Sequence, residues 1–594
     1  MLRRHRADRN RPVPVSPPSR SPDRDDWDDK SMSEEAIKQA VQLALRGMGV
    51  EDADVRLDQP RDPSHGDLAT TVALTLAKVL GRPPLAIAEE IASRIDTGRF
   101  AIESVSVAGP GFLNFKLSSG QVASGLVEII AADDDYGRCD EGGGESTVVE
   151  FVSANPTGPL HLGHGRQGAI GDAIAGLLDW TGWSVSREYY YNDTGAQIDR
   201  LAESVWARYQ QRFGHEEEIP EGGYQGKYVG EIAASLAEEH GDRFVGIRDE
   251  EALDVMRETA VRTLRAEQDL DLSDFRIHFD VYFLESSLYD DGRVVSTVEA
   301  LRGTGKVFDL DGAVWLRTTD YGDQKDRVMI KSDGSPTYFL PDVAYHMDKW
   351  ERGFHHAINV QGSDHHGTVA RVQAGVQALG LPAGYPEYVL HQMVRVERDG
   401  KEVKFSKRAG SYTTLRELMA EVGVDVTRYF FQMRKPDSHL VFDLALALDQ
   451  SDKNPVYKVQ YAHARMCSIF KKAGLERSSI GTDGVDLSVL ATDAERELIK
   501  ALTQFPELVR NAARLRAPHL ICDYLEQTAG AVNSWYHAGN PSRNPKLAVL
   551  VEDDGLRGAR LALSRSVQIV LRNGLTILGI MAPEQMIRDE DVAG

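Results

Sequence analysis

The sequence lacks three features that would have restricted its class. Its 594 residues include only three cysteines. Because Cys139, Cys467 and Cys522 are far apart, neither a disulfide framework nor a cysteine-based zinc site is indicated. No apolar run is long enough to predict a membrane span. Net positive charge is also absent, since 68 Lys and Arg face 91 Asp and Glu, for a formal charge of −23. This balance argues against a generally basic nucleic-acid binder but leaves room for local basic patches.

The residues that are present have the composition of a large globular protein. Hydrophobic residues make up 42% and charged residues 27%, which is ordinary for that class. At about 150 residues per domain, the length predicts roughly four units. The few cysteines fit a reducing cytosol, so we expect a cytoplasmic location. Residues 1–31 are mostly polar and rich in Pro, Arg, Ser and Asp. They predict disorder, and their aspartates argue against a transit peptide.

The sequence predicts a multidomain protein that combines α/β and all-α parts. After a disordered extension at 1–32, residues 33–120 predict a small α/β domain. In this domain helical spacing at 34–49 and 67–81 precedes a strand at 110–118. An acidic, Gly-rich linker follows. From about 449 to 594 helical periodicity dominates, which predicts a C-terminal helical bundle.

Residues 145–448 predict a Rossmann-type catalytic domain with a parallel sheet. The apolar run 148–152 suits a buried strand. A helix with one buried face follows, and a strand at 183–193 completes a βαβ unit. That helix is indicated by the spacing of Ile170, Ala173, Ile174, Leu177 and Leu178. Charged helical residues at about 200–275 predict an insertion. Strand-like segments return at 313–318, 328–334, 357–362 and 388–396.

The stretch GPLHLGHGRQGAIGD, residues 158–172, places two histidines and several glycines at the first strand-to-helix turn. Ligands of open α/β sheets bind at such turns, and a helix N-terminus suits phosphate. His161 and His164 can donate hydrogen bonds to phosphate oxygens. The glycines at 158, 163, 165 and 168 would let a base or ribose approach the backbone. Two alternatives remain open. The histidines could only cap a helix, or they could hold a metal, although no third ligand is evident.

A second stretch, KFSKRAG at 404–410, places Lys404 and Lys407 on either side of Ser406. A short loop with two lysines can hold pyrophosphate as charge develops during nucleotidyl transfer. Taken alone, such a stretch is more often an ordinary solvated basic loop. Its combination with the two histidines, near the end of the same predicted domain, is far rarer.

Together the two stretches resemble the signatures of class I aminoacyl-tRNA synthetases, usually quoted as HIGH and KMSKS. Here they read His-Leu-Gly-His and Lys-Phe-Ser-Lys-Arg, so Arg replaces the last serine of the second signature. From Ser33 on, the chain resembles arginyl-tRNA synthetases in particular. The strings that carry this likeness are HGDLATTVALTLAK, PGFLNFKL, EFVSANPTGPLHLGHGR, YYYNDTGAQI, FDVYFLESSLY, DRVMIKSDGSPTYFLPDVAYH and YAHARMCSIFKKAG.

The resemblance implies an arginine-binding site. A guanidinium is planar and has five donors, so it requires fixed carboxylates. Glu285 and Asp342 match the family's guanidinium-binding acids. Tyr338 helps them, four residues before Asp342. Asn155 matches a residue that binds the α-amino end, with Glu150 in support.

The remaining implied residues lie in two stretches around this site. Asp364, His365 and His366 are weaker candidates near the adenosine and the α-amino group. The HIGH region as a whole comprises Ala154, Asn155, Pro156, Thr157, Gly158, Pro159, Leu160, His161, Leu162, Gly163 and His164.

The resemblance also implies the reaction and its partners. ATP, as its Mg²⁺ complex, would activate L-arginine to arginyl-adenylate, and arginine would then pass to the terminal ribose of tRNA(Arg). The helical domain would bind the anticodon. Tyr461, His463, Arg465 and Lys471 mix aromatic and basic groups as unstacked bases require, although such a helix could equally pack its aromatics inward. No structural metal and no membrane contact are expected, and the family is usually monomeric.

Two other functions remain to be weighed. A regulatory, RNA-binding relative could keep the fold without the reaction. The intact histidines, both lysines and both guanidinium-binding acids argue against it. A class I synthetase for another amino acid is the second alternative, and the YFLPD and LESS strings disfavour it.

Overall fold

The computed structural model describes residues 32–51, 53–58, 60, 65–100, 102–193, 195–403, 414–540 and 542–586. The predicted disordered extension and the predicted loop 404–410 therefore lie outside the described residues. The chain divides into two compact units, Met1–Gln121 and Val122–Gly594. Within the described part, no helix is long and apolar enough to cross a membrane.

The first unit packs helices against a three-stranded antiparallel sheet of order β1-β3-β2. Its elements are α1 (Met32–Arg46), β1 (Leu68–Thr70), α2 (Val72–Leu80), α3 (Pro84–Arg94), β2 (Ile102–Ala108) and β3 (Phe112–Leu117). The helix predicted at 67–81 is wrong over its first residues, which form β1. Ala69 pairs with Asp58 on one side and Asn114 on the other, and this pairing overrides the local helical spacing.

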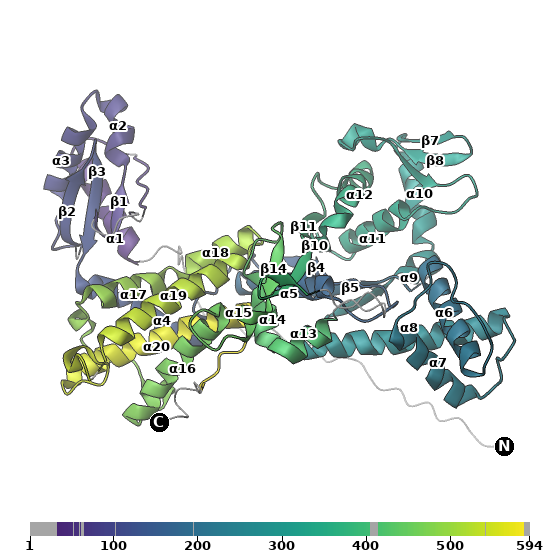
Figure 1. Cartoon of the computed structure of the whole chain (residues 1–594). Helices are drawn as coiled ribbons and strands as arrows, with labels where there is room; N and C mark the ends of the chain where they lie inside the picture. The colour runs from purple at the N-terminus through teal and green to yellow at the C-terminus, as the bar shows by residue number, and fades with distance from the viewer. Residues whose placement is uncertain are drawn as a thin grey trace, which may run out of the picture. The chain divides into compact units, whose positions relative to one another are not determined.

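The second unit is built on a parallel sheet with strand order β11-β10-β4-β5-β6. The strands are β4 (Ser146–Glu150), β5 (Ser184–Tyr191), β6 (Val281–Leu284), β10 (His356–Gly362) and β11 (Glu387–His391). From β4 the chain adds β5 and β6 on one side, then returns to place β10 and β11 on the other (Figure 1). This confirms the predicted Rossmann-type sheet, with its reversal point between β4 and β10.

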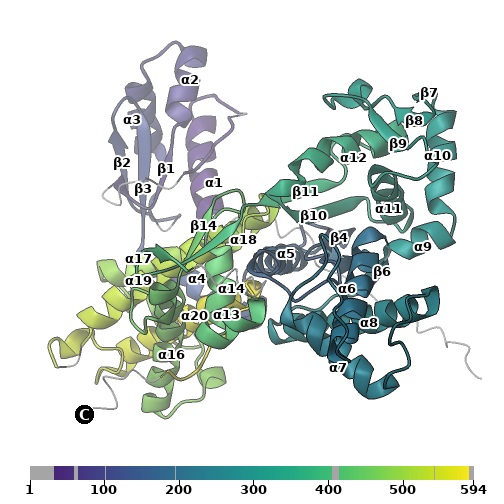
Figure 2. The same ribbon diagram turned by 45° about the vertical axis from the view of Figure 1, so that its right-hand side comes forward.

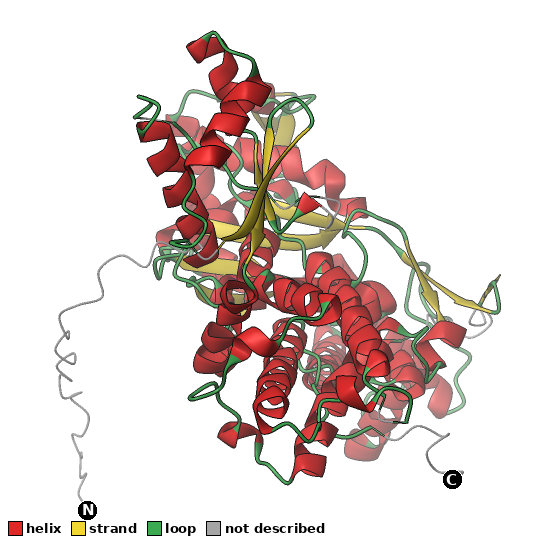
Figure 3. Cartoon of the chain, turned by 90° about the vertical axis from the view of Figure 1, so that its left-hand side faces the viewer, coloured by secondary structure: helices red, strands yellow, loops and turns green. Residues whose placement is uncertain are grey.

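Helices surround this sheet, and a helical bundle follows it (Figure 3). After α4 (Ser119–Ala132), the helices of the catalytic part are α5 (Leu162–Trp180), α6 (Ala196–Arg212), α7 (Lys227–His240), α8 (Glu250–Asp274), α9 (Glu285–Asp290), α10 (Arg293–Gly303), α11 (Phe339–Glu351), α12 (His366–Ala378), α13 (Leu415–Val422), α14 (Val424–Gln432) and α15 (Leu444–Leu448). The bundle consists of α16 (Pro455–Ala473), α17 (Asp493–Thr503), α18 (Phe505–Arg514), α19 (His519–Ala538) and α20 (Asp554–Ile577). The predicted helical insertion and C-terminal bundle are therefore confirmed.

Helix α5 connects β4 to β5, and Figure 2 shows it nearly end-on against the sheet. The prediction of a single buried face is wrong, because α5 is buried along most of its length. Helices α13, α14, α18 and α20 cover the sides that the sheet leaves free. Arg166, fully buried on α5, donates to the carbonyl oxygens of Gln392, Lys435 and Ser438. The helix is thereby fixed to loops from other parts of the domain.

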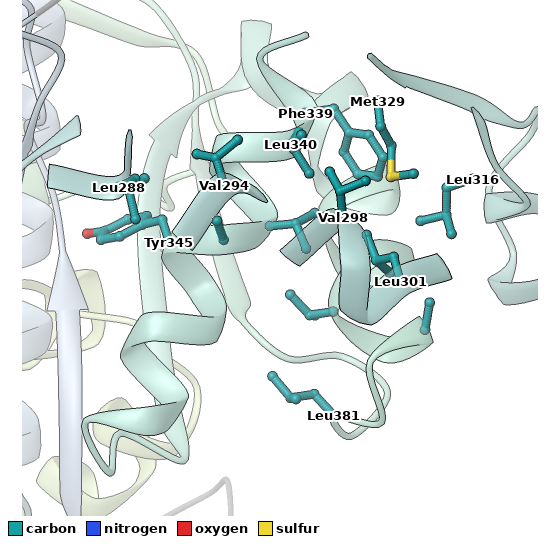
Figure 4. Packing of buried hydrophobic residues seen from close by; sticks show 14 of the residues in the cluster. Leu288, Val294, Val298, Leu301, Leu316, Met329, Phe339, Leu340, Tyr345 and Leu381 are labelled. Atoms are coloured by element: carbon teal, nitrogen blue, oxygen red, sulfur yellow. The ribbon is translucent and has the colours of Figure 1, made fainter. Parts of the chain in front are cut away.

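An apolar cluster holds α11 in place (Figure 4). Leu288 of α9, Val294 and Leu301 of α10 and Phe339 of α11 all belong to it. Residues from a small antiparallel sheet also pack there. That sheet comprises β7 (Val307–Leu310), β8 (Ala313–Leu316) and β9 (Arg327–Ile330). One side of α11 therefore packs in the apolar cluster, and the polar side chains of the helix lie on its other side.

A last small sheet has the order β13-β12-β14 and follows the main sheet in sequence. Its strands are β12 (Val394–Arg398), β13 (Lys401–Glu402) and β14 (Leu440–Asp443). The single strand predicted at 388–396 is therefore two strands, β11 and β12. Gln392 and Met393 separate them, and the backbone N–H of Gln392 donates to Pro436 O outside both strands.

Gly171→Ala should lower the melting temperature. The new Cβ would lie 2.3 Å from Cγ of Phe151, and overpacking a core costs about 1–3 kcal/mol. Gly230→Ala on α7 is the matched control, because its Cβ would meet nothing within 4 Å and alanine favours a helix by about 1 kcal/mol. Thermal unfolding followed by circular dichroism measures both variants. A Gly171→Ala protein that melts no lower than the parent would contradict the close packing described here.

Candidate functional site

The site is expected where the strand order reverses, beyond the carboxyl ends of β4 and β10. Glu150 is the last residue of β4, and the histidine-containing turn follows it. Beyond β10, a short 3-10 helix at Ser363–His365 precedes α12. His391 ends β11 at the same edge of the sheet. The topology thus brings together three of the segments in which the sequence predicted functional residues.

The turn after β4 has a strained backbone that the surrounding structure holds in place. Val152 and Ser153 have φ of 68° and 41°, values that residues with side chains rarely adopt. The Ser153 hydroxyl donates to Glu150 Oε1 at 3.0 Å and accepts from the Tyr190 N–H at 3.2 Å. The Ala154 N–H donates to the Tyr189 hydroxyl at 3.0 Å. Backbone strain held in this way is typical of binding sites.

The insertion supports the next part of the turn. Gln268 of α8 donates to the carbonyl oxygens of Asn155 and Gly158, at 3.1 and 2.8 Å. The Tyr228 hydroxyl of α7 donates to the carbonyl oxygen of Thr157 at 2.8 Å. The Asn155 amide donates to Gln197 Oε1 at 2.7 Å. The insertion therefore fixes the path of the chain that leads to the two histidines.

The two histidines cap the helix that they precede. His161 is the N-cap of α5, and its Nδ1 accepts from the N–H groups of Gly163 and His164 at 3.0 and 3.3 Å. His164 Nδ1 accepts from the His161 N–H at 3.3 Å. The rings stack with centroids 3.6 Å apart. The capping alternative is therefore correct as a description of geometry, and it leaves a binding role open.

Capping also determines which ring nitrogen carries the proton. Burial lowers the pKa of His161, and it lowers the pKa of His164 to about 3 with help from the neighbouring His161 and His391. Both rings are therefore neutral near pH 7. Because each Nδ1 accepts a backbone hydrogen bond, each proton resides on Nε2. Both side chains thus supply an Nε2–H donor without bringing a positive charge.

Close packing requires three of the glycines of this stretch. A Cβ on Gly165 would lie 2.7 Å from Leu415 Cδ1, and one on Gly168 would lie 2.8 Å from Ile277 Cδ1. These two positions face the protein's own side chains, so their predicted role in admitting a base or ribose is wrong. At Gly163 an added Cβ would meet the His161 ring. Glycine is therefore needed there for His161 and His164 to stack.

Three carboxylates converge near the end of β4. Glu150 is buried, and Glu285 is buried at the start of α9. Asp342 is half-buried in the first turn of α11. Burial raises the pKa of Glu285, while a hydrogen bond from Tyr190 acts in the opposite direction. Tyr338, predicted to assist Asp342, is the N-cap of α11 and is 70% exposed. The structure therefore brings together the acids that the sequence scattered over nearly 200 residues.

Asp342 carries the clearest electrostatic signature of this cluster. Burial raises its pKa, the charges of Glu285 and Glu150 add to the rise, and Arg371 acts in the opposite direction, so that the pKa of Asp342 is about 7. The same acidic charges also affect the pKa values of three tyrosines near Asp342. Burial and these acidic neighbours raise the pKa values of Tyr190, Tyr289 and Tyr388. A cluster with such an excess of acceptors favours a cationic ligand.

Sequence analysis missed a second layer of polar residues behind the acids. Lys349 Nζ donates to Glu150 Oε2 at 2.6 Å and to Asn359 Oδ1 at 3.0 Å. His346 contacts both Asn359 and the backbone of Asp342. The signal was present as polar residues at helical spacing along α11, in the string DVAYHMDK. It was overlooked because a lysine and a histidine on a helix are usually solvated.

The remaining predicted site residues of the catalytic domain are either exposed or lie outside the residues that the structure describes. His365 and His366 are exposed. Asp364 is also exposed, and its charge raises the pKa of His161 against the larger effect of burial. Lys404, Ser406 and Lys407 lie outside the described residues. Thr414, the first described residue after them, forms an isolated β-bridge with His161.

The helical bundle separates the predicted tRNA-binding residues. Tyr461 stacks on Tyr457 with centroids 5.9 Å apart, and the Arg465 guanidinium lies 4.6 Å from the centre of the Tyr461 ring. Lys471 is exposed in the last turn of α16. His463 is only 1% exposed, and its ring nitrogens contact Pro583 O and Gln568. His463 is therefore a core residue, and its predicted place on an RNA-facing surface is wrong.

Known families match the chain over almost all of its described length. The arginyl tRNA synthetase N terminal domain matches residues 32–117, and the catalytic domain of tRNA synthetases class I (R) matches 126–429. The DALR anticodon binding domain matches 459–586. A curated arginine–tRNA ligase of Geotalea daltonii is 50% identical over 538 residues, which cover 89% of this chain and 94% of that relative.

Solved structures give the same result. A putative arginyl-tRNA synthetase from Campylobacter jejuni has a TM-score of 0.72 at 30% identity, covering 79% of this chain and all of that one. The arginyl-tRNA synthetase of Thermus thermophilus has a TM-score of 0.68 at 25% identity, covering 93% of this chain and all of that one. Fold, site topology, family matches and relatives agree, and the chain belongs to the arginyl-tRNA synthetase family.

Proposed function

We propose how this arginine–tRNA ligase carries out its reaction with the residues described above. ATP activates L-arginine to arginyl-adenylate, and the arginyl group then passes to tRNA(Arg). The observation that carries the assignment of the pocket is the cluster of Glu150, Glu285 and Asp342. Its excess of negative charge complements a guanidinium, which never loses its proton. Because Lys349 already pairs with Glu150, a neutral amino acid would leave Glu285 and Asp342 uncompensated, which favours arginine over the substrates of other class I enzymes.

In this proposal each end of arginine has its own partners. Asp342 and Glu285 bind the guanidinium, with Tyr338 beside them. Asn155 holds the α-amino end, supported by Glu150. The carboxylate is then directed toward the histidine turn, where ATP would be placed. His365 is kept as a weaker candidate because it lies at the same edge of the sheet.

The first step is an attack of an arginine carboxylate oxygen on the α-phosphorus of ATP. A new P–O bond forms, and the bond to the β-phosphate oxygen breaks, releasing pyrophosphate. The Nε2–H donors of His161 and His164 stabilise charge that develops on the phosphate oxygens. Lys404, Ser406 and Lys407 hold the departing pyrophosphate. ATP enters as its Mg²⁺ complex, and we assign no structural metal to the chain.

The second step transfers the arginyl group to the terminal ribose of the tRNA. A ribose hydroxyl oxygen attacks the arginyl carbonyl carbon, and AMP leaves with the electrons of the anhydride bond. The helical bundle binds the anticodon, with Tyr461, Arg465 and Lys471 as candidate contacts. We further propose that the chain acts as a cytoplasmic monomer without membrane contact. Its proposed domains span 33–120, 145–448 and 449–594.

His164→Ala should slow adenylate formation about 100-fold or more, because loss of one preorganised donor to developing charge costs about 3 kcal/mol. Single-turnover adenylate synthesis measures the effect. His215→Ala removes an exposed loop histidine of the insertion and should leave the rate unchanged. A His164→Ala rate within twofold of the parent would remove His164 from the mechanism.

Asp342→Asn should raise the Michaelis constant for arginine about 30-fold or more. The substitution keeps the shape of the side chain but turns a desolvated charge pair into a charge facing an amide, at a cost of about 2–5 kcal/mol. The Michaelis constant for ATP should hardly change. The measurement is tRNA-dependent pyrophosphate exchange, with the exposed Asp290→Asn on α9 as the control. An unchanged arginine constant would place Asp342 outside the pocket.

The arginine Michaelis constant of the parent should depend on pH around neutrality. Asp342, with a pKa of about 7, is charged above that pH and binds a proton below it, so cation binding weakens as pH falls. For one such group we expect a rise of about tenfold between pH 8 and pH 6. The pKa values of His164, His346 and His391 are lowered to about 3, 3 and 4, so these histidines stay neutral over this range. Asp342→Asn should abolish the rise, and a parent without any rise would contradict the shifted acid.

A further inference from the structure

Three neighbouring strands each present one buried polar side chain at the same level of the sheet. Asn359 on β10, Glu150 on β4 and Glu188 on β5 are register partners in turn. Their side chains therefore leave the same face of the sheet. All three residues are buried. Polar groups buried in this way need partners, because leaving them without hydrogen bonds is costly.

Helix α11 and its C-cap Arg352 supply these partners, and Arg352 donates to both carboxylate oxygens of Glu188 at 2.6 and 3.0 Å. Lys349 of α11 contacts Glu150 and Asn359, as described above. The Tyr345 hydroxyl donates to Glu188 Oε1 at 2.6 Å. Lys349 is 0% exposed, and its Nζ lies 4.3 Å from the centre of the Tyr345 ring. The polar side of α11 is thus matched to the row of strand residues, with Lys349 at its centre.

The ammonium group of Lys349 fixes the direction of a hydrogen-bond chain. Lysine can only donate, so the oxygen of the Asn359 amide must face Nζ and the Asn359 NH₂ must face His346. That NH₂ donates to His346 Nε2 at 2.6 Å. The His346 proton therefore resides on Nδ1, which donates to the Asp342 carbonyl oxygen at 2.7 Å. The chain ends on the backbone of the residue proposed to bind the guanidinium.

A second arm from Lys349 reaches the histidine turn. Its ion pair fixes Oε2 of Glu150, and the other carboxylate oxygen, Oε1, accepts from the Ser153 hydroxyl. Ser153 is one of the two strained residues that begin the turn. The Lys349 ammonium is thus the start of two hydrogen-bond chains. One leads through Asn359 to Asp342, and the other leads through Glu150 to the turn after β4.

We propose that Lys349 is a positioning residue of the reaction, which holds Glu150 directly and Asp342 through Asn359 and His346 in the geometry that binds arginine. It contacts no substrate in this proposal. The inference rests on the proposed arginine pocket. The new element is that arginine recognition depends on Lys349. This lysine lies behind the acids of the pocket and is positively charged, as arginine is.

Lys349→Met tests this inference in the full-length enzyme. Removal of the cation leaves Glu150 without its counter-ion and Asn359 free to reverse its amide. We expect the Michaelis constant for arginine in tRNA-dependent pyrophosphate exchange to rise roughly ten- to hundredfold, as small misplacements of binding groups do. The constant for ATP should stay within about twofold. A purely structural lysine would raise both constants together or lower only the amount of folded enzyme.

Arg560→Met is the matched control. Arg560 is buried on α20 and pairs with Glu495 at 2.8 Å, in the helical bundle and away from the arginine pocket. This variant also removes a buried ion pair, so it should lower the melting temperature and leave the arginine constant unchanged. An arginine effect of equal size in both variants would overturn the inference.

Asn359→Ala keeps the test decisive if Lys349→Met does not fold. It preserves the Lys349–Glu150 pair and interrupts only the chain to His346, so the arginine constant should still rise while that for ATP does not. An arginine constant within twofold of the parent would overturn the role of the chain. Asp342→Asn distinguishes an error in the proposed arginine pocket from an error in the positioning role of Lys349. If it leaves arginine use unchanged, the pocket itself is wrong, whereas a normal Lys349→Met beside a defective Asp342→Asn rejects only the positioning role.

Discussion

The active-site region depends on the contact between the polar side of α11 and the carboxyl ends of three parallel strands. The apolar side of α11 is held by the cluster in Figure 4, so the helix has little freedom to turn about its axis. Its polar side meets Glu150, Glu188 and Asn359, which the sheet register places in one row. Asp342 lies on the same helix, one turn before His346. The place of Asp342, the acid proposed to bind the guanidinium, is thus set by packing on both sides of one helix.

The same region contains strained backbone and clustered acidic side chains, whose mutual repulsion a bound cation would reduce. Val152 and Ser153 keep unfavourable backbone angles because their neighbours hold them there, and the charges of Glu285 and Glu150 help to raise the pKa of Asp342. Arginine and the phosphates of ATP carry opposite charges. In the proposed function the acids bind the cationic end of arginine, and the neutral histidines of the turn donate hydrogen bonds to the phosphates.

The acidic character of the chain must be reconciled with its tRNA partner. With a formal charge of −23, the protein repels a polyanion at long range. Contact would therefore depend on local cations, and Lys471 and Lys472, exposed in the last turn of α16, are candidates for it. Such contacts weaken as salt rises, because counterions compete for the phosphates. Aromatic stacking around Tyr461 would be less sensitive to salt.

The sequence by itself determined the fold class, the βαβ unit around the histidine turn, the helical insertion and the helical C-terminal part. Apolar periodicity and glycine placement are local signals, and each of these features is encoded locally. Family resemblance added Glu285 and Asp342, which no spacing rule would have connected. The local signals failed where distant partners compete with them. Residues 68–70 joined a strand, α5 became buried nearly all round, and His463 entered the core.

Only the tertiary structure revealed Lys349. In sequence it is a lysine among other charged residues of a helix, and such residues are usually solvated. Its importance arises from the register of β10 and β4, which places Asn359 beside Glu150 in a buried row and so gives the buried ammonium two hydrogen-bond partners. Strand order and register are set by contacts between segments some 200 residues apart, and no local pattern in the sequence encodes them.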